Sequence, residues 1–180
     1  MRVLVAYAGV HGATRSIAER IADRLRRAGL DADLRPAHEV ASVAGYDAVV
    51  LGSAIHNGEW LPEAAALVDR GADALAACPT WLFSVGMVAD RSSSPRPAVV
   101  RMLRLRPPVP DAVAAAVRAG VVAGRHHRFT GVFLREHTGR FGALLYRAMG
   151  GRFGDHRDWD DVHRWADGVA ATLVGERAGR

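Results

Sequence analysis

The sequence predicts an α/β fold in which a five-stranded parallel sheet lies between two layers of helices. Short apolar runs alternate along the chain with stretches whose apolar residues recur at helical spacing. Parallel strands need long crossover connections, so the intervening helices are expected to cover both faces of the sheet. Five strands within 180 residues suit the doubly wound strand order 2-1-3-4-5 in a single domain that spans residues 1–180.

The predicted strands are short apolar runs of the kind that parallel sheets bury on both faces. They cover residues 3–7, 32–35, 48–51, 81–85 and 120–123. The predicted helices cover residues 14–28, 62–76, 96–106 together with 111–118, 141–149 and 159–173. The first helix carries Ile17, Ile21 and Leu25 on one stripe, and the last begins after Asp158, a typical N-cap residue.

Composition excludes several classes of protein. The hydrophobic fraction of 49% supports a full core, and no apolar stretch approaches the roughly 18 residues of a membrane span. Because a strand begins at once, we expect no signal peptide. Cys78 is the single cysteine, which favours the reducing cytoplasm and a buried, unreactive thiol. The chain contains no lysine, which excludes Schiff-base and P-loop lysine chemistry.

The positive charge is concentrated in residues 125–157, here called the basic insertion. This segment holds seven arginines and two acidic residues, so it carries the whole net charge of +5. We interpret it either as a solvated surface segment or as a rim for an anionic, ring-shaped or membrane-borne partner. The predicted helix 141–149 is basic and amphipathic, which suits peripheral association with an anionic membrane. No nucleic-acid motif accompanies the charge, so nucleic acid is not the expected partner.

The first predicted strand leads through a loop of small residues into the first helix, an order that is typical of phosphate binding. Gly9, Gly12 and Ala13 let backbone N–H groups approach an anion, and Thr14 can cap the helix or donate its hydroxyl. The candidate phosphate-binding residues, here called the first loop, are Ala8, Gly9, Val10, His11, Gly12, Ala13 and Thr14.

Two further loops are expected at the same place, because parallel strands end at one edge and ligands bind where the strand order reverses. The second loop covers residues 52–60 and the third covers residues 85–90. Their small residues allow a flat ring to lie against the backbone, flanked by Ile55, His56, Trp60, Met87 and Val88. The binding candidates are Ser53, Ala54, Ile55, His56, Asn57, Val85, Gly86 and Met87. A phosphate and a flat heterocycle describe a mononucleotide, and a flavin fits best.

Four short motifs carry a resemblance to a known family. They are Ala-Gly-Val-His-Gly-Ala-Thr at 8–14, Gly-Ser-Ala-Ile-His-Asn-Gly at 52–58, Phe-Ser-Val at 83–85, and Gly-Gly at 150–151 followed by Asp-Trp at 158–159. Together with the basic insertion, these motifs resemble the flavodoxin superfamily and, within it, the menaquinone-dependent protoporphyrinogen dehydrogenases. The third motif adds Ser84 to the cofactor-binding candidates.

The resemblance implies an FMN-dependent oxidoreductase of heme biosynthesis, in which hydride leaves a porphyrinogen and electrons pass to a quinone. The flavin supplies the redox chemistry, and no protein catalytic base is predicted. The propionates of a porphyrinogen would pair with arginines of the basic insertion, for which the candidates are Arg125, Arg128, Arg135 and Arg140. A quinone acceptor would bring the chain to the inner face of the cell membrane.

Departures from the family keep alternatives open. Its phosphate loop supplies hydroxyls where this chain has Ala8 and Gly9, and each lost bond costs about 1.5–3 kcal/mol unless water or backbone replaces it. His11, when protonated, would recover part of that loss. The alternatives are a flavodoxin-type electron carrier, an NAD(P)H:quinone reductase, and a flavodoxin-like domain that has lost FMN. A pI near 10.5 disfavours the carrier, because such carriers are usually acidic.

Overall fold

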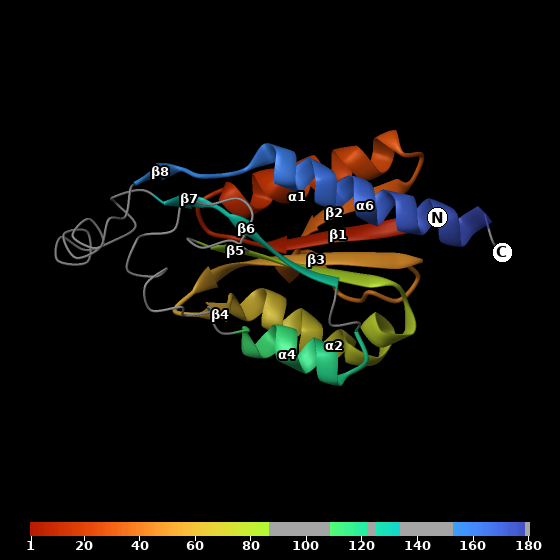
Figure 1. Ribbon diagram of the computed structural model, residues 1–180. Coiled ribbons are helices and arrows are strands. Elements are labelled where there is room, and N and C mark those ends of the chain that lie inside the picture. The colour runs from red at the N-terminus through yellow and green to blue at the C-terminus, as the bar shows by residue number, and fades with distance from the viewer. Residues whose placement is uncertain (87–108, 122–124, 134–152, 179–180) are drawn as a thin grey trace.

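The computed structural model places one sheet between two layers of helices (Figure 1). The structure describes residues 1–86, 109–121, 125–133 and 153–178. In Figure 1, α1 (Ala13–Arg27) and α6 (Trp159–Ala178) cover the upper face of the sheet. The lower face is covered by α2 (Pro62–Ala77) and α4 (Asp111–Arg118). The predicted α/β fold with helices on both faces is confirmed.

The sheet follows the order β2-β1-β3-β5-β6, and neighbouring strands along this path are parallel. The strands are β1 (Arg2–Ala8), β2 (Asp31–Pro36), β3 (Ala48–His56), β5 (Thr80–Gly86) and β6 (His126–Thr130). This path is the predicted 2-1-3-4-5 order. The carboxyl ends of these strands lie together at the left in Figure 1, and this side of the sheet is here called the carboxyl edge.

The described helices fall where apolar residues recur at helical spacing. Ile17, Ile21 and Leu25 of α1 are fully buried, as the stripe predicts. A short 3-10 helix, η1 (Ala37–Glu39), follows β2. The helices predicted at 96–106 and 141–149 lie outside the described residues. Within the described ranges, no helix combines the length and the apolar character that crossing a membrane requires.

The sheet has six strands rather than the predicted five, because the second loop contains a hairpin. Strand β4 (Glu59–Trp60) pairs antiparallel with the end of β3. The turn between them has positive φ at both Asn57 (52°) and Gly58 (90°). Two consecutive residues with positive φ make the tight turn that suits the twist of a two-residue hairpin. The Asn-Gly pair is itself a hairpin signal. The sequence prediction assigned this segment to ligand binding and did not include a hairpin.

The fifth parallel strand is β6 at His126–Thr130, and not the predicted 120–123. Gly120 and Val121 belong to no strand, and residues 122–123 lie outside the described residues. Strand β6 ends the strand path and contains two histidines and an arginine, so it lacks the apolar run of a central strand. Its polar groups are bonded instead. His127 Nε2 lies 2.9 Å from Asp161 Oδ2 of α6, and His126 Nε2 lies 2.8 Å from Ser84 Oγ of β5. The basic insertion therefore begins inside the sheet.

The core has one apolar cluster on each face of the sheet. Under α1 and α6, the rings of Phe83 and Phe129 pack with centroids 5.8 Å apart. Gly52 makes room for this packing, because a Cβ there would lie 2.1 Å from the Phe83 ring. Under α2 and α4, Leu67 is fully buried, and the half-buried Cys78 packs against the same cluster.

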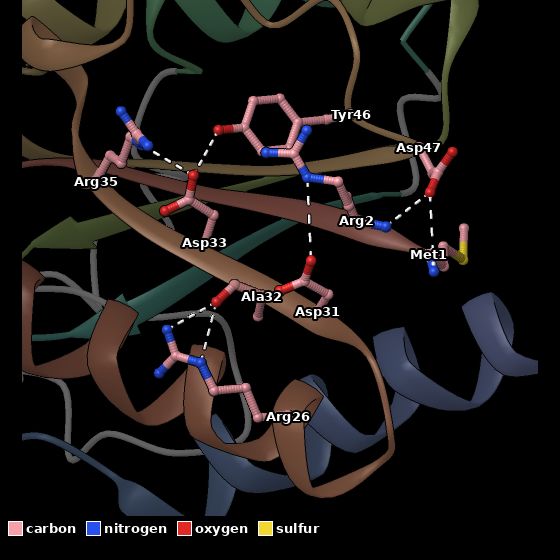
Figure 2. A network of polar contacts seen from close by, with 9 residues as sticks. All are labelled: Met1, Arg2, Arg26, Asp31, Ala32, Asp33, Arg35, Tyr46 and Asp47. Atoms are coloured by element: carbon pink, nitrogen blue, oxygen red, sulfur yellow. Dashed lines mark hydrogen bonds and ion pairs between the residues drawn. The ribbon is translucent and has the colours of Figure 1, made fainter.

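Strand β2 ends the sheet on the other side, and charged groups line it (Figure 2). The guanidinium of Arg26 donates two hydrogen bonds to the carbonyl of Ala32, at 3.0 and 2.7 Å. Asp33 accepts a hydrogen bond from the hydroxyl of Tyr46 at 2.6 Å and one from Arg35 at 2.9 Å. These bonds lower the pKa of the Asp33 carboxyl, and the Tyr46 bond contributes most. Charged and bonded side chains of this kind protect an edge strand from pairing with another chain.

Candidate functional site

The first loop joins the end of β1 to the start of α1 at the carboxyl edge. Gly12 is the N-cap residue and has a left-handed backbone (φ 80°), so no side chain caps the helix. The first turn of α1 contains no acidic residue. The N–H groups at a helix start have no partner within the helix, and they carry the positive end of its dipole. The loop therefore offers an anion both hydrogen-bond donors and a favourable field.

Close packing shapes this loop. Thr14 is 2% exposed, and a Cβ added to Gly9 would lie 2.7 Å from the Thr14 Cβ. Gly9 therefore permits the chain to pass over Thr14 at a distance that no other residue allows without movement. Val10 is 71% exposed and His11 is also exposed, while Ala8 is buried at the end of β1. The tip of the loop faces solvent and its base is fixed.

A cavity of about 410 Å³ opens beside the first loop. Its lining from the first loop and α1 consists of Ala8, Gly9, Val10, Gly12 and Arg15, and its lining from other elements consists of Tyr7, Pro36, His38, Leu61 and Glu63. A cavity of this size is typical of small-molecule sites. Sequence reasoning missed the second group. The order 2-1-3 could have indicated Pro36 and His38, since it places the end of β2 beside the end of β1.

The second loop divides into a buried base and an exposed tip. Ser53 is fully buried, where its hydroxyl donates to the Ala54 carbonyl at 2.8 Å and accepts from the Leu61 N–H at 2.9 Å. Ala54 and Ile55 are half-buried, and His56 and Asn57 are exposed at the hairpin turn. Ser53 thus fixes the hairpin, and the next four residues form the part of this loop that a ligand can reach.

The third loop is described only as far as Gly86, so Met87 and Val88 lie outside the described residues. Ser84 is 1% exposed and accepts a hydrogen bond from Trp60 Nε1 at 2.7 Å. The structure therefore buries Trp60, at 5% exposed, instead of leaving its indole beside an open ring site. A Cβ added to Gly86 would lie 3.6 Å from the Cβ of Ile55, so the ends of β3 and β5 meet here.

The base of the basic insertion also lies at the carboxyl edge. Two short strands, β7 (Val132–Phe133) and β8 (Gly154–Asp155), pair antiparallel just beyond β6 (Figure 1). The N–H of Gly131 donates to the Gly86 carbonyl at 2.9 Å, and the N–H of His156 donates to the Gly131 carbonyl at 3.2 Å. Two parts of the insertion, residues 130–133 and 154–156, therefore lie at the carboxyl edge beside the end of β5.

The two candidate substrate arginines that the structure describes, Arg125 and Arg128, lie at different places, just before β6 and within it respectively. Arg128 is 7% exposed within β6. Arg125 lies at the opposite end of this strand, where its guanidinium is 4.3 Å from the Trp81 ring centroid and 3.7 Å from Glu176. The structure therefore does not bring Arg125 to the carboxyl edge, and Arg135 and Arg140 lie outside the described residues. Sequence reasoning missed Arg157, which does reach this edge and bonds to Ser16 in the first turn of α1.

These features fit a flavin mononucleotide better than a metal ion. A dianionic phosphate matches the uncapped start of α1, and Gly86, which has no side chain, leaves the backbone beside Ile55 open to a flat ring. Among the described residues, no group of three or more His, Cys, Asp or Glu side chains is arranged to hold a metal.

Comparisons with known proteins agree with this geometry. A family model described as Flavodoxin domain matches residues 4–137. Protoporphyrinogen IX dehydrogenase [quinone] of Escherichia coli (strain K12) is 27% identical, and the match covers 94% of this chain and 95% of that protein.

Solved structures with low sequence identity share the fold. A flavodoxin from the domain Archaea superposes with a TM-score of 0.59 at 13% identity, over 96% of this chain and 99% of the other. Rubredoxin oxygen:oxidoreductase of Desulfovibrio gigas gives a TM-score of 0.60 at 14% identity and covers 98% of this chain. This chain spans only 37% of the length of that oxidoreductase.

Proposed function

This chain belongs to the flavodoxin domain family, whose cofactor is FMN, and from that premise we propose that it is an oxidoreductase that dehydrogenates a porphyrinogen and passes the electrons to a quinone. The observation that carries the redox assignment is the first loop. There α1 begins without a side-chain cap and without an acidic residue in its first turn, and a cavity of about 410 Å³ opens beside it. The substrate assignment is supported by the 27% identity to a protoporphyrinogen IX dehydrogenase [quinone] over 94% of the chain.

In this proposal, the phosphate of FMN lies on the N–H groups of the first loop and accepts a hydrogen bond from the Thr14 hydroxyl. The flavin ring lies at the ends of β3 and β5, where Ile55 meets Gly86 and where His56 and Asn57 form an exposed rim. When bound, FMN accepts and releases the electrons, and the protein binds it, orients it and limits its contact with water.

The proposed substrate is a tetrapyrrole that carries carboxylates. The basic insertion contains the whole excess of positive charge, and its base lies at the carboxyl edge beside β5. Arg128, Arg135 and Arg140 remain the candidates for pairing with the carboxylates. Arg125 is left out, because its guanidinium is held by Trp81 and Glu176 at the other end of the sheet. A quinone in a membrane would bring the chain to the inner membrane surface through residues 125–157.

An absorption spectrum of the purified chain, recorded before and after FMN is added, tests the cofactor assignment. We expect a flavin spectrum that remains with the protein after gel filtration. Turnover of protoporphyrinogen IX with menadione as acceptor then tests the substrate assignment, with boiled protein and free FMN as controls. A chain that takes up no FMN in any buffer would overturn the proposal.

The same assays separate the alternatives. Rapid reduction of the bound flavin by NADPH, with no oxidation of protoporphyrinogen IX, would make the chain an NAD(P)H:quinone reductase. A bound flavin that accepts electrons from neither compound would favour an electron carrier. Sedimentation with vesicles that contain anionic lipid tests the membrane contact, and this binding should weaken as salt is raised.

A further inference from the structure

Arg157 ties three segments together at the carboxyl edge. Its Nε donates to Asp155 Oδ1 of β8 at 2.8 Å, and its Nη1 donates to Ser16 Oγ of α1 at 2.7 Å. The guanidinium also lies over the ring of Trp159 at the start of α6, 4.7 Å from the ring centroid. Only 20% of the Arg157 side chain is exposed, so these contacts are partly shielded from water. One side chain therefore connects β8, α1 and α6.

The bond to Ser16 reaches the turn that offers its N–H groups to an anion. Ser16 Oγ accepts from Arg157 and donates to the Ala13 carbonyl at 2.8 Å, which fixes the turn from its outer side. A cation beside a helix start opposes the helix dipole, so this charge gives a bare helix no electrostatic gain. The positive charge of Arg157 becomes favourable once an anion lies on the same turn. Asp155 balances the charge of Arg157, and the ion pair lowers the pKa of the Asp155 carboxyl.

The segment that contains Arg157 is also fixed to the ends of β5 and β6. The hydroxyl of Thr130 donates to the His156 carbonyl, and the His156 N–H donates to the Gly131 carbonyl. A Cβ on Gly131 would lie 2.9 Å from Val85 Cγ1 and 4.0 Å from the Cβ of Ala13. The β7–β8 pair thus cannot shift relative to the first loop without breaking contacts on two sides.

We propose that Arg157 is a positioning residue through which a phosphate on the first loop and the β7–β8 pair stabilise each other. The inference rests on the proposed function, because it requires the phosphate of FMN on the first loop. The coupling is reciprocal, since a contact that strengthens phosphate binding is itself strengthened by the phosphate. This coupling would recover part of the phosphate affinity that is lost because Ala8 and Gly9 carry no hydroxyl. It would also let cofactor binding fix the β7–β8 pair of the basic insertion.

Titration of the full-length apoprotein with FMN and with riboflavin, which lacks the phosphate, tests this role. The variants are Arg157→Gln, Arg157→Lys, and Arg24→Gln as the matched control. Arg24 also joins α1 to an aspartate, Asp167 of α6, but three helical turns from the ligand-facing residues of the first loop. We expect Arg157→Gln to weaken FMN binding about tenfold, a size typical of the coupling between two linked sites, and to leave riboflavin binding unchanged. Arg157→Lys should restore part of the FMN affinity, and Arg24→Gln should change neither affinity.

Hydrogen exchange gives the second measurement. In the wild type, FMN should slow exchange at residues 13–17 and 154–157, and Arg157→Gln should remove the effect at 154–157. The role of Arg157 is refuted if the wild type binds FMN and Arg157→Gln binds it equally tightly, or if both flavins lose affinity by the same factor. If the wild type binds FMN in no buffer, the proposed function itself fails, and the inference fails with it.

Discussion

The first loop differs from the β2 edge, by which we mean β2 and the charged side chains that line it, in how its polar groups are bonded. Along β2, the charged side chains drawn in Figure 2 are bonded within the chain, as in Asp33, which accepts from the Tyr46 hydroxyl, and Arg26, which donates to the Ala32 carbonyl. At the first loop, α1 begins at Ala13 without a side-chain cap and without an acidic residue in its first turn. The first loop follows β1, and β2 is the neighbour of β1 in the sheet, so the two regions differ although they lie close together in the fold.

This difference separates stability from binding. Polar groups that are bonded within the folded chain contribute to its stability and need no ligand. Donors at a helix start that lack a partner add little to stability, and they retain their full capacity for an anion. Changes at the β2 edge are therefore expected to lower the free energy of unfolding, and changes in the first loop are expected to lower the affinity for FMN.

The largest effect is expected from Gly9→Val, because a Cβ at this position would lie 2.7 Å from the Thr14 Cβ. The loop then has to move away from Thr14, and its N–H groups lose their common direction. We expect FMN affinity to fall by at least about a hundredfold, the equivalent of about 2.7 kcal/mol. Fluorescence titration of the apoprotein with FMN measures this change.

Tyr46→Phe serves as the control for Gly9→Val, because it alters the β2 edge and leaves the first loop intact. Gly9→Val should keep the circular dichroism spectrum of the wild type. Equal FMN affinity for Gly9→Val and the wild type would show that the first loop does not bind the phosphate.

A smaller loss is expected from Thr14→Ala, which removes the hydroxyl that this loop retains from its family's usual donors. A hydrogen bond to a charged acceptor contributes about 1.5–3 kcal/mol, so FMN affinity should fall between about tenfold and a hundredfold. Thr14→Ser keeps the hydroxyl and should restore most of the affinity. If Thr14→Ser binds as weakly as Thr14→Ala, the buried methyl group is what matters, and the hydroxyl has no role in binding.

Sequence patterns predicted the central part of the fold well. The central strands β1, β3 and β5 are apolar runs because helices cover them on both faces, and this burial leaves a readable pattern. Strand β6 left no such pattern, because it lies at the end of the strand path and its polar side chains find partners in other elements. His127 bonds to Asp161, 34 residues later in the chain, and no local periodicity encodes that contact.

The candidate site was predictable to the same extent. The small residues of the first loop predicted the turn between β1 and α1, since Gly9 packs on Thr14 and Gly12 has a positive φ, while its role in binding phosphate stays a prediction. The roles of Ser53 and Ser84 were not predictable. Both hydroxyls hold the β3–β4 hairpin, through Leu61 and Trp60, and a motif cannot distinguish a serine that binds a ligand from one that fixes a turn. Their assignment to cofactor binding stays a prediction that only a bound complex can test.

At the β2 edge, Tyr46→Phe should lower the free energy of unfolding by about 1 kcal/mol, because it removes a part-buried hydrogen bond to the Asp33 carboxylate. FMN affinity should stay at the wild-type value. Urea denaturation with equal m-values for the two proteins measures the stability change. A loss of FMN affinity as large as that of Thr14→Ala would show that the two regions are coupled, and the comparison between them would fail.

The smallest effect is a pH dependence that Asp33→Asn should remove. The Tyr46 hydroxyl, followed by Arg35, lowers the pKa of the Asp33 carboxyl below its ordinary value of 3.8. A carboxyl with a lowered pKa in the folded state contributes stability above its unfolded-state pKa, and this contribution is lost as pH falls through the folded-state pKa. Above about pH 5, Asp33→Asn should therefore be less stable than the wild type by under about 1 kcal/mol, given the partly exposed pair. The difference in stability should shrink as pH falls below about 4.

Asp155 and Asp167 also have lowered pKa values, but both proteins retain them, so their contributions cancel in the difference. A gap that stays constant down to acidic pH would mean that Asp33 acts through the shape of its side chain and not through its charge.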